Sequence, residues 1–444
     1  MAAMLNYPRI PELDFVFEIR SLHRPGNLGR LMTAIGDEQG LIGDITTQFV
    51  GKTHSIREIT ISVFDEEHLA RIQNAIAQQP GAEILHVKDP IFERHKGGKI
   101  HCGRKTDIRA LADLRYVYTP GVARVCMAVH QDPAKVREYT GISNSVGVFT
   151  NGTRVLGLGD IGVLASLPLM EGKTMIYDQF VGISATPILV DTKDPKEFVQ
   201  VVERVAPTFG GIHLEDIRIP DCFYIETELI RKLHKPVMHN DQHGTATVVL
   251  AALMSAVRQM GIPDCRQLAV AQIGLGAAGF GIARLLMDYG LRVVGVDPNE
   301  QSRAWFVASG GTTATLEEAL AHADVVIAAT GVPGLITGEM IRKGQTILAL
   351  TNPVPEIYPE EALEAGAAFA CDGKLINNAL AYPGLFKAAL EINAEQISPP
   401  MKIAAAQAIS ELADKEELVP SIFHPDLHRK IVAAVEHSTG RSSH

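Results

Sequence analysis

Two adjacent carboxylates mark the first place in this chain where chemistry is expected. Glu215 and Asp216 stand at the end of an apolar, strand-like stretch, within the sequence GGIHLEDIRIPD. Neighbouring like charges repel each other, so such a pair needs either water or a cation around it. Two interpretations follow: a solvated turn, or ligands of a divalent metal ion. The rest of the chain must decide between them.

A glycine-rich turn further along the chain predicts a dinucleotide site. Gly274, Gly276 and Gly279 fall between an apolar strand and a helix, and the next strand ends at Asp297. Such glycines let the backbone approach a pyrophosphate, whose charge the helix N-terminus stabilises. An acid at Asp297 binds the ribose hydroxyls and disfavours a 2′-phosphate, so we expect NAD rather than NADP. The alternative is a structural glycine turn in a domain that binds no nucleotide.

The residues expected at the cofactor extend from this turn into the later strands of the same sheet, at residues 323–331 and 345–353. They are Gly274, Gly276, Ala277, Ala278, Gly279, Asp297, Thr330, Gly331 and Asn352.

The first elements of the chain form a pattern of their own. Alternating strands at residues 14–21, 41–51, 54–64 and 82–89 are combined with amphipathic helices at residues 24–40 and 65–81. The resulting order, β-α-β-β-α-β, predicts a ferredoxin-like module. Through its RPGNLGRL turn this stretch resembles an ACT domain, which implies a regulatory module for a small effector such as an amino acid. The alternative is a ferredoxin-like dimerisation module without a ligand.

Composition excludes several classes of partner. The chain has 444 residues and a net charge of −10, which disfavours nucleic acid and anionic membranes as partners. Its longest apolar run, at residues 248–257, is too short to span a bilayer, and the N-terminus lacks a signal-peptide pattern. Five scattered cysteines without a CxxC pair are typical of a reducing cytoplasm.

Several motifs around the carboxylate pair together resemble the malic enzyme family. In chain order they are VYTPGVARVC, TNGTRVLGLGDIGVLASLPLMEGK, GGIHLEDIRIPD, HNDQHGTAT, TNPVPE and INNALAYPG. The resemblance covers residues 100–390. It implies oxidative decarboxylation of L-malate to pyruvate and CO2, with NAD or NADP and with Mg2+ or Mn2+. It also answers the opening question, because Glu215, Asp216 and Asp241 take the positions of the family's metal ligands.

The same resemblance assigns the other reacting groups. Lys173 takes the place of the general base that removes the C2 hydroxyl proton, and Tyr118 that of the acid that protonates the enol. Tyr116 lies two residues earlier and shares the strand face, so an ambiguity between the two tyrosines stays open. The substrate-binding residues implied are Arg154, Asn352 and Asn378, with Asn377 adjacent to the last.

The sequence HND departs from the family pattern, in which many members carry two aspartates. Asn240 replaces one of them, which removes a negative charge beside Lys173 and favours loss of the lysine proton. His239 and His243 flank the acids. We expect them to cap or pack the helix rather than to bind metal or cofactor.

The expected fold is therefore a multidomain α/β protein. Its parts are an ACT-like domain (1–90), a substrate and metal domain (91–245), a Rossmann NAD-binding domain (246–395) and a helical segment packing on the body (396–444). The expected protein is a cytoplasmic NAD-dependent malic enzyme that forms a homodimer or a larger homo-oligomer. Two rival functions are another NAD-linked dehydrogenase on a similar scaffold and a non-catalytic, ACT-coupled NAD sensor.

Overall fold

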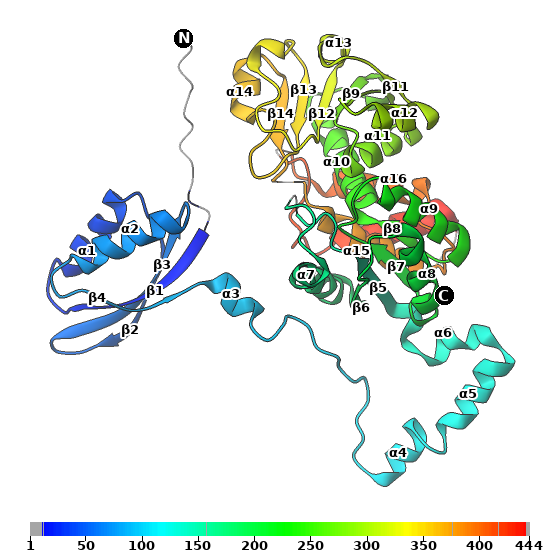
Figure 1. The fold of residues 1–444 in the computed structure, drawn as a ribbon, viewed down its shortest axis with the longest axis horizontal. Coiled ribbons are helices and arrows are strands. Elements are labelled where there is room, and N and C mark those ends of the chain that lie inside the picture. Colours follow the sequence, from blue (N-terminus) through cyan, green and yellow to red (C-terminus); the bar gives the residue numbers. More distant parts are fainter. Residues whose placement is uncertain (1–10, 12, 157, 375, 416, 441–444) are drawn as a thin grey trace. The chain divides into compact units, whose positions relative to one another are not determined.

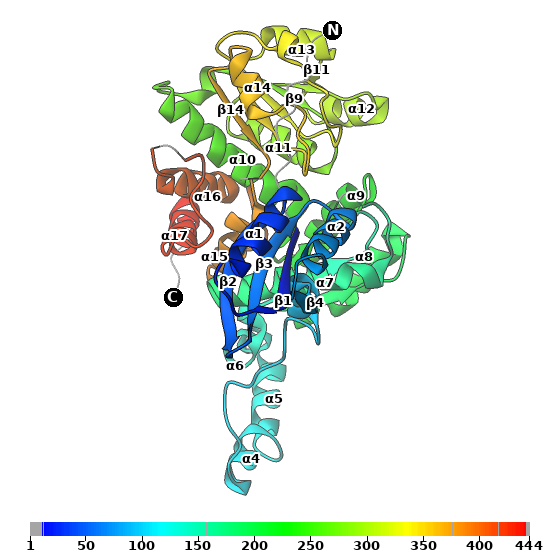
Figure 2. The same cartoon turned by 90° about the vertical axis from the view of Figure 1, so that its left-hand side faces the viewer.

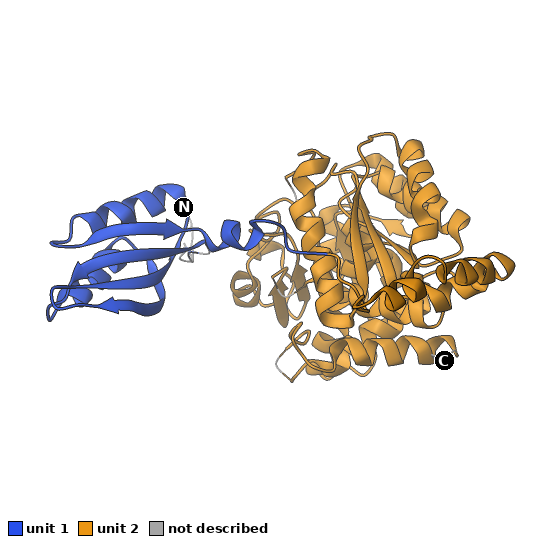
Figure 3. Ribbon diagram, turned by 90° about the horizontal axis from the view of Figure 1, so that it is seen from below, with its two compact units in different colours: residues 1–101 blue, residues 102–444 orange. Residues whose placement is uncertain are grey.

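The computed structural model describes residue 11 and residues 13–156, 158–374, 376–415 and 417–440. The chain divides into two compact units, residues 1–101 and residues 102–444 (Figure 3). Each unit is described by itself below.

Unit 1 is an antiparallel sheet with helices packed against it. Its elements are β1 (Leu13–Leu22), α1 (Asn27–Asp37), β2 (Leu41–Val50), β3 (His54–Val63), α2 (Glu66–Ala77), β4 (Glu83–Lys88) and α3 (Pro90–His95). The strand order is β2-β3-β1-β4, and every adjacent pair is antiparallel. The β-α-β-β-α-β order expected from the sequence is present.

The core of unit 1 follows the periodicity of its sequence. Ile59, Ile61 and Val63 alternate along β3 and are buried with Leu31 and Ile35 of α1. The side chain of Asp65 accepts a hydrogen bond from His68 N and so begins α2 at the predicted place. The outer strand β2 differs, because its apolar side chains, such as those of Phe49 and Val50, are exposed.

Unit 2 contains two parallel sheets. The first has the order β6-β5-β7-β8 and consists of β5 (Ser145–Thr150), β6 (Ser184–Leu189), β7 (Gly211–Leu214) and β8 (Val237–His239). The second has the order β11-β10-β9-β12-β13-β14 and consists of β9 (Ala269–Ile273), β10 (Arg292–Val296), β11 (Thr312–Thr313), β12 (Val325–Ala328), β13 (Thr346–Ala349) and β14 (Phe369–Asp372). In sequence order this is 3-2-1-4-5-6, the arrangement of a Rossmann sheet.

Helices connect and cover these strands. They are α4 (Leu111–Val117), α5 (Val122–Gln131), α6 (Val136–Tyr139), α7 (Val163–Val181), α8 (Pro195–Val205), α9 (Asp221–Leu233), α10 (Asn240–Gln259), α11 (Ala277–Asp288), α12 (Glu300–Ala308), α13 (Leu316–His322), α14 (Pro359–Glu364), α15 (Tyr382–Glu391), α16 (Pro399–Leu412) and α17 (Leu427–Thr439). Short 3-10 turns are η1 (Pro133–Lys135), η2 (Gly141–Asn144), η3 (Ala206–Thr208), η4 (Cys265–Gln267), η5 (Gly338–Met340) and η6 (Asn378–Leu380).

The long helix α10 joins the two sheets of unit 2. It runs between the part that holds β5–β8 and the part that holds β9–β14 (Figures 1 and 2). It crosses α11 closely, since a Cβ atom on Gly281 would lie 2.6 Å from Gln242 O. Only glycine permits the two helices to lie this close. The contact fixes the first turn of α10 against α11, the helix that follows the glycine-rich turn.

Helices α4 and α5 contrast with this packed body. Neither buries a residue, and the side chains of Leu111 and Tyr116 are 78% and 77% exposed. In both views these helices project away from the rest of unit 2 (Figures 1 and 2). They therefore present apolar surface that no other described part of unit 2 covers.

Among the residues that the structure describes, no helix combines the length and the apolar character needed to cross a membrane.

Candidate active site

The three acids expected to bind metal come together in unit 2. Glu215 and Asp216 follow β7 at the carboxyl end of the first sheet, and Asp241 lies in the first turn of α10. One oxygen of each lies within 4.8 Å of the others. Asp216 has a left-handed backbone, with φ of 54°, and its N–H donates to Asp241 Oδ2 at 2.9 Å. The turn therefore aims consecutive carboxylates at one point.

The electrostatics of this cluster fit a cation. Glu215 and Asp216 are 2% and 5% exposed, and Asp216 Oδ2 has no hydrogen-bond partner among the described residues. Burial and the charges of Asp241 and Glu215 raise the pKa of Asp216 to about 8. Burial raises the pKa of Asp241, but the adjacent His239, the charge of Lys173 and the backbone N–H of Asp216 together outweigh it and hold that pKa well below its ordinary value. Clustered carboxylate oxygens are the ligands that Mg2+ and Mn2+ prefer, so the residues present fit such an ion.

Lys173 lies directly beside the acids. Its side chain comes from α7 and is 12% exposed, and its Nζ is 3.0 Å from Glu215 Oε1. The same Nζ donates to Asn378 Oδ1 at 3.0 Å, and it lies 5.2 Å from the centre of the Tyr382 ring. The structure thus brings together the predicted lysine, the predicted Asn378 and the acid cluster.

The second carboxylate oxygen of Glu215, Oε2, contacts residues that the sequence analysis did not select. His213 Nε2 lies 2.5 Å from Glu215 Oε2, and Tyr177 Oη lies 2.9 Å from His213 Nδ1. Both side chains are fully buried. Asn240 Nδ2 donates to the same Oε2 at 3.0 Å, so the amide that replaces an aspartate supplies a donor to Glu215. Oε2 is therefore fixed by protein groups, while Oε1 faces Lys173.

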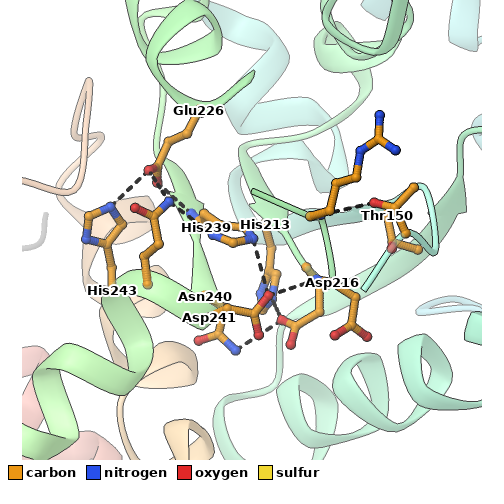
Figure 4. A network of polar contacts seen from close by, with 12 residues as sticks. Thr150, His213, Asp216, Glu226, His239, Asn240, Asp241 and His243 are labelled. Carbon is orange, nitrogen blue, oxygen red and sulfur yellow. Dashed lines mark hydrogen bonds and ion pairs between the residues drawn. The ribbon is translucent and has the colours of Figure 1, made fainter. Parts of the chain in front are cut away.

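A second polar chain leads away from Asp241 (Figure 4). His239 Nε2 lies 3.2 Å from Asp241 Oδ2, and Gln242 Nε2 lies 3.1 Å from both His239 Nδ1 and Glu226 Oε2. His243 Nε2 contacts Glu226 Oε2 at 3.0 Å. His239 is also the residue that precedes the first turn of α10. The buried Glu226, which the sequence analysis did not select, is the acceptor at the centre of this chain.

The glycine-rich turn opens a large cavity in the Rossmann part of unit 2. The cavity has a volume of about 990 Å³, and its lining includes Gly274, Gly276, Asp297 and Thr330. Asp297 Oδ2 accepts a hydrogen bond from Leu275 N at 2.7 Å, which fixes the carboxylate at the end of β10.

The neighbouring residues of the fingerprint shape the turn. A Cβ atom on Gly279 would lie 1.9 Å from Gly274 O, so α11 approaches the turn as the fingerprint requires. Ala277 and Ala278 form the first turn of α11. Thr330 N and Gly331 N donate to Glu356 Oε1 and Thr351 Oγ1, which holds the loop after β12.

The predicted substrate residues lie in different places. Arg154 follows β5, lines the same cavity as Asp297, and donates from its backbone N to Asp216 O at 3.1 Å. It therefore connects the acid cluster with the cavity. Asn352 is exposed in the loop after β13. Its amide nitrogen lies so close to Gly373 that a Cβ atom added there would be only 2.9 Å away.

Tyr118 is not brought to the cluster within this chain. It ends α4, and its side chain is 64% exposed. The contacts that the structure records around Lys173 and the acids include neither Tyr118 nor Tyr116. The role of the tyrosine stays a prediction.

A lysine and buried acids beside a dinucleotide cavity in a Rossmann sheet define a dinucleotide-dependent oxidoreductase. Two family models match the chain: the malic enzyme N-terminal domain at residues 105–230, and the coenzyme F420-dependent NADP oxidoreductase family at residues 269–352. NAD-dependent malic enzyme 1 of Bacillus subtilis is 48% identical over 417 residues, which is 93% of this chain and 95% of that protein. The chain belongs to the malic enzyme family.

Further relatives agree with this assignment. The NAD-dependent malic enzyme of Geobacillus stearothermophilus is 38% identical over 93% of this chain and 91% of its own length. The crystal structure of malic enzyme from Pyrococcus horikoshii has a TM-score of 0.74 and 38% identity, and covers 79% of this chain and 90% of that one. The NAD-dependent malic enzyme of Thermotoga maritima has a TM-score of 0.73 and 34% identity, over 79% and 99% of the two chains.

Proposed function

We propose that this enzyme oxidatively decarboxylates L-malate to pyruvate and CO2 with NAD as the electron acceptor and with a divalent metal ion. The observation that carries the proposal is Lys173 Nζ at 3.0 Å from Glu215 Oε1, within a cluster of three acids of which Glu215 and Asp216 are buried. The names of the Bacillus and Geobacillus relatives, both NAD-dependent malic enzymes, support the choice of substrate and cofactor.

Each residue of the site has a proposed role in the reaction. Arg154 binds a malate carboxylate through its planar guanidinium, and Asn352 and Asn378 orient substrate and nicotinamide. Lys173 Nζ accepts the proton of the C2 hydroxyl, and Asn378 Oδ1 positions that nitrogen at 3.0 Å. Glu215, Asp216 and Asp241 would hold Mg2+ or Mn2+, which lowers the pKa of a substrate oxygen and polarises the carbonyl when bound. The cavity beside Asp297 would hold NAD, which accepts the hydride.

The test is reduction of NAD and of NADP by L-malate, with Mn2+ and then with excess EDTA. Turnover that needs the metal, favours NAD and yields pyruvate supports the proposal. Turnover that persists in EDTA would indicate another dehydrogenase reaction. No turnover in folded protein that still binds NAD would indicate a sensor.

We also propose that a second copy of the chain completes the site. Tyr118 lies at the end of a helix that buries none of its residues, next to the exposed apolar side chain of Tyr116. Exposed apolar surface of this kind needs a cover, and the site needs an acid for the enol. A homodimer in which each copy gives Tyr118 to its partner supplies both.

Residues 1–90, which lie within unit 1, are proposed to be an ACT domain with a ferredoxin-like fold that binds a small effector. Its element order and antiparallel sheet support this. Deletion of residues 1–90 should remove kinetic responses to added amino acids while keeping turnover. The finer division of the rest of the chain into domains at residues 91–245, 246–395 and 396–444 is likewise proposed.

The location proposed for the protein is the cytoplasm. The five unpaired cysteines favour such a reducing compartment.

A further inference from the structure

A second cavity of unit 2 has no part in the proposed reaction. Its volume is about 540 Å³, within the range of small-molecule sites, and it lies among α9, α10, α11, α12 and α16. The dinucleotide cavity is lined by other residues of α12, such as Ser302 and Arg303, whereas Trp305 of α12 lines this one. The two cavities therefore share a helix but no lining residue.

The apolar wall of this second cavity is aromatic. Phe223 and Phe280 have ring centres 4.9 Å apart, and Phe223 and Trp305 have theirs 5.9 Å apart. All three line the cavity and are only partly buried. Such a wall suits a flat apolar body.

The polar end of the cavity is a buried ammonium group. Lys402 on α16 is 7% exposed, and its Nζ lies 3.0 Å from His243 Nδ1. An ammonium can only donate, so His243 Nδ1 accepts and its Nε2–H donates to Glu226. The described residues give Nζ no further hydrogen-bond partner, which leaves two of its three donors for a ligand.

The charges nearby favour an anion at that end. Burial lowers the pKa of Lys402, a cost that a bound anion offsets. Arg284 lines the same cavity and adds positive charge. Of the two acids in the lining, Glu226 is occupied by His239 N, Gln242 and His243, and Asp288 is exposed at the rim.

We propose that this cavity is a second ligand site, which binds a small aromatic organic anion with its charged group on Lys402 and its ring against Phe223, Phe280 and Trp305. The site is linked to the acid cluster by residues already described. Lys402 contacts His243, which contacts Glu226, and Gln242 and His239 continue the chain to Asp241. An anion bound here therefore lowers the electrostatic potential at the acids and tightens cation binding.

The chain offers its own reporter for a test. Trp305 is the only tryptophan in the sequence, so energy transfer from it reports an aromatic probe bound near this side chain, and the cavity variants below locate the probe. The probe is 1-anilinonaphthalene-8-sulfonate, added to the full-length protein with saturating NAD to block the dinucleotide cavity. We expect saturable binding at one site, and binding at least tenfold weaker for uncharged N-phenyl-1-naphthylamine.

Variants separate this site from other apolar surfaces. Lys402→Met removes the charge and should weaken binding at least tenfold, and Thr227→Phe should do so by filling the cavity without touching Lys402. Lys387→Met, at a partly buried lysine on α15, is the matched control and should bind as the parent does. The proposal is overturned if the probe does not bind, or if NAD displaces it. It is also overturned if the uncharged analogue binds equally well, or if both cavity variants, in folded protein, bind the probe as the parent does.

The link to the acids has a separate readout. Saturating probe should tighten Mn2+ binding, measured by calorimetry, by about fivefold, and Mn2+ should tighten probe binding by the same factor. Unchanged Mn2+ affinity would contradict the link. These readouts need no catalysis, so their failure is distinguishable from failure of the proposed reaction.

Discussion

Lys173 Nζ lies 3.0 Å from both Glu215 Oε1 and Asn378 Oδ1, so one amino group touches an expected metal ligand and an expected substrate ligand. The lysine comes from α7, whereas its partners come from the loop that follows β7 and from η6. Proton transfer and binding are therefore expected to depend on the same few atoms.

Replacement of that lysine tests its role as the base. Lys173→Met should lower kcat by about a hundred- to ten-thousand-fold, the usual contribution of a positioned base, while NAD binding persists. The matched control is Lys232→Met, which removes a surface ion pair with Glu203 worth ~0–1 kcal/mol. A kcat for Lys173→Met within threefold of the parent would exclude the lysine as the base.

Metal affinity should depend on pH through Asp216. Its pKa is raised to about 8 by burial and neighbouring carboxylates, so below that pH a cation must displace its proton. Mn2+ affinity, measured by calorimetry, should therefore rise by about tenfold per pH unit up to roughly pH 8 and then level off. Asp216→Asn should bind Mn2+ more weakly and lose this slope. A slope retained in Asp216→Asn would assign the titration to another group.

Asp297 should set the preference for NAD. Asp297→Asn keeps an oxygen that can accept from Leu275 N but removes the charge. NAD should bind about ten- to a hundredfold more weakly, since a hydrogen bond to a charged group contributes ~1.5–3 kcal/mol. NADP should gain, because its 2′-phosphate no longer meets a carboxylate. The measurement is kcat/KM for both cofactors, and an unchanged ratio would contradict the assignment.

Mixed dimers test whether Tyr118 acts across subunits. Tyr118→Phe and Lys173→Met should each be inactive alone. Co-expressed in equal amounts, they should recover about a quarter of parental activity, because half of the dimers are mixed and each mixed dimer has one complete site. Tyr116→Phe should stay active. Purified mixed dimers without activity would show that the tyrosine acts within its own chain.

The sequence predicted the parts of the fold that periodicity and turn chemistry determine. The β-α-β-β-α-β order of unit 1 and the strand–glycine turn–helix at Gly274 are both present. The acid pair and Asp241 also meet as expected. These features follow from local spacing or from a motif that carries its own geometry.

The parts that could not be predicted depend on which buried faces meet. His213 and Tyr177 lie on a strand and a helix and form a pair only when the two pack together. Glu226 did carry a signal, since it lies on the same face of α9 as Cys222, Ile225 and Leu229, all buried. A charge on an apolar helix face indicates a buried polar partner, but its identity requires the fold.

The close crossing of α10 and α11 limits how this enzyme can be rebuilt. Gly281 meets the backbone of Gln242, the residue next to Asp241. An engineer who exchanged the Rossmann half for that of another dehydrogenase would import that protein's own residue at this crossing. Any side chain there would push the turn that carries Asp241 out of place. A chimera of the two halves therefore needs glycine at this crossing, or both helices from the same parent.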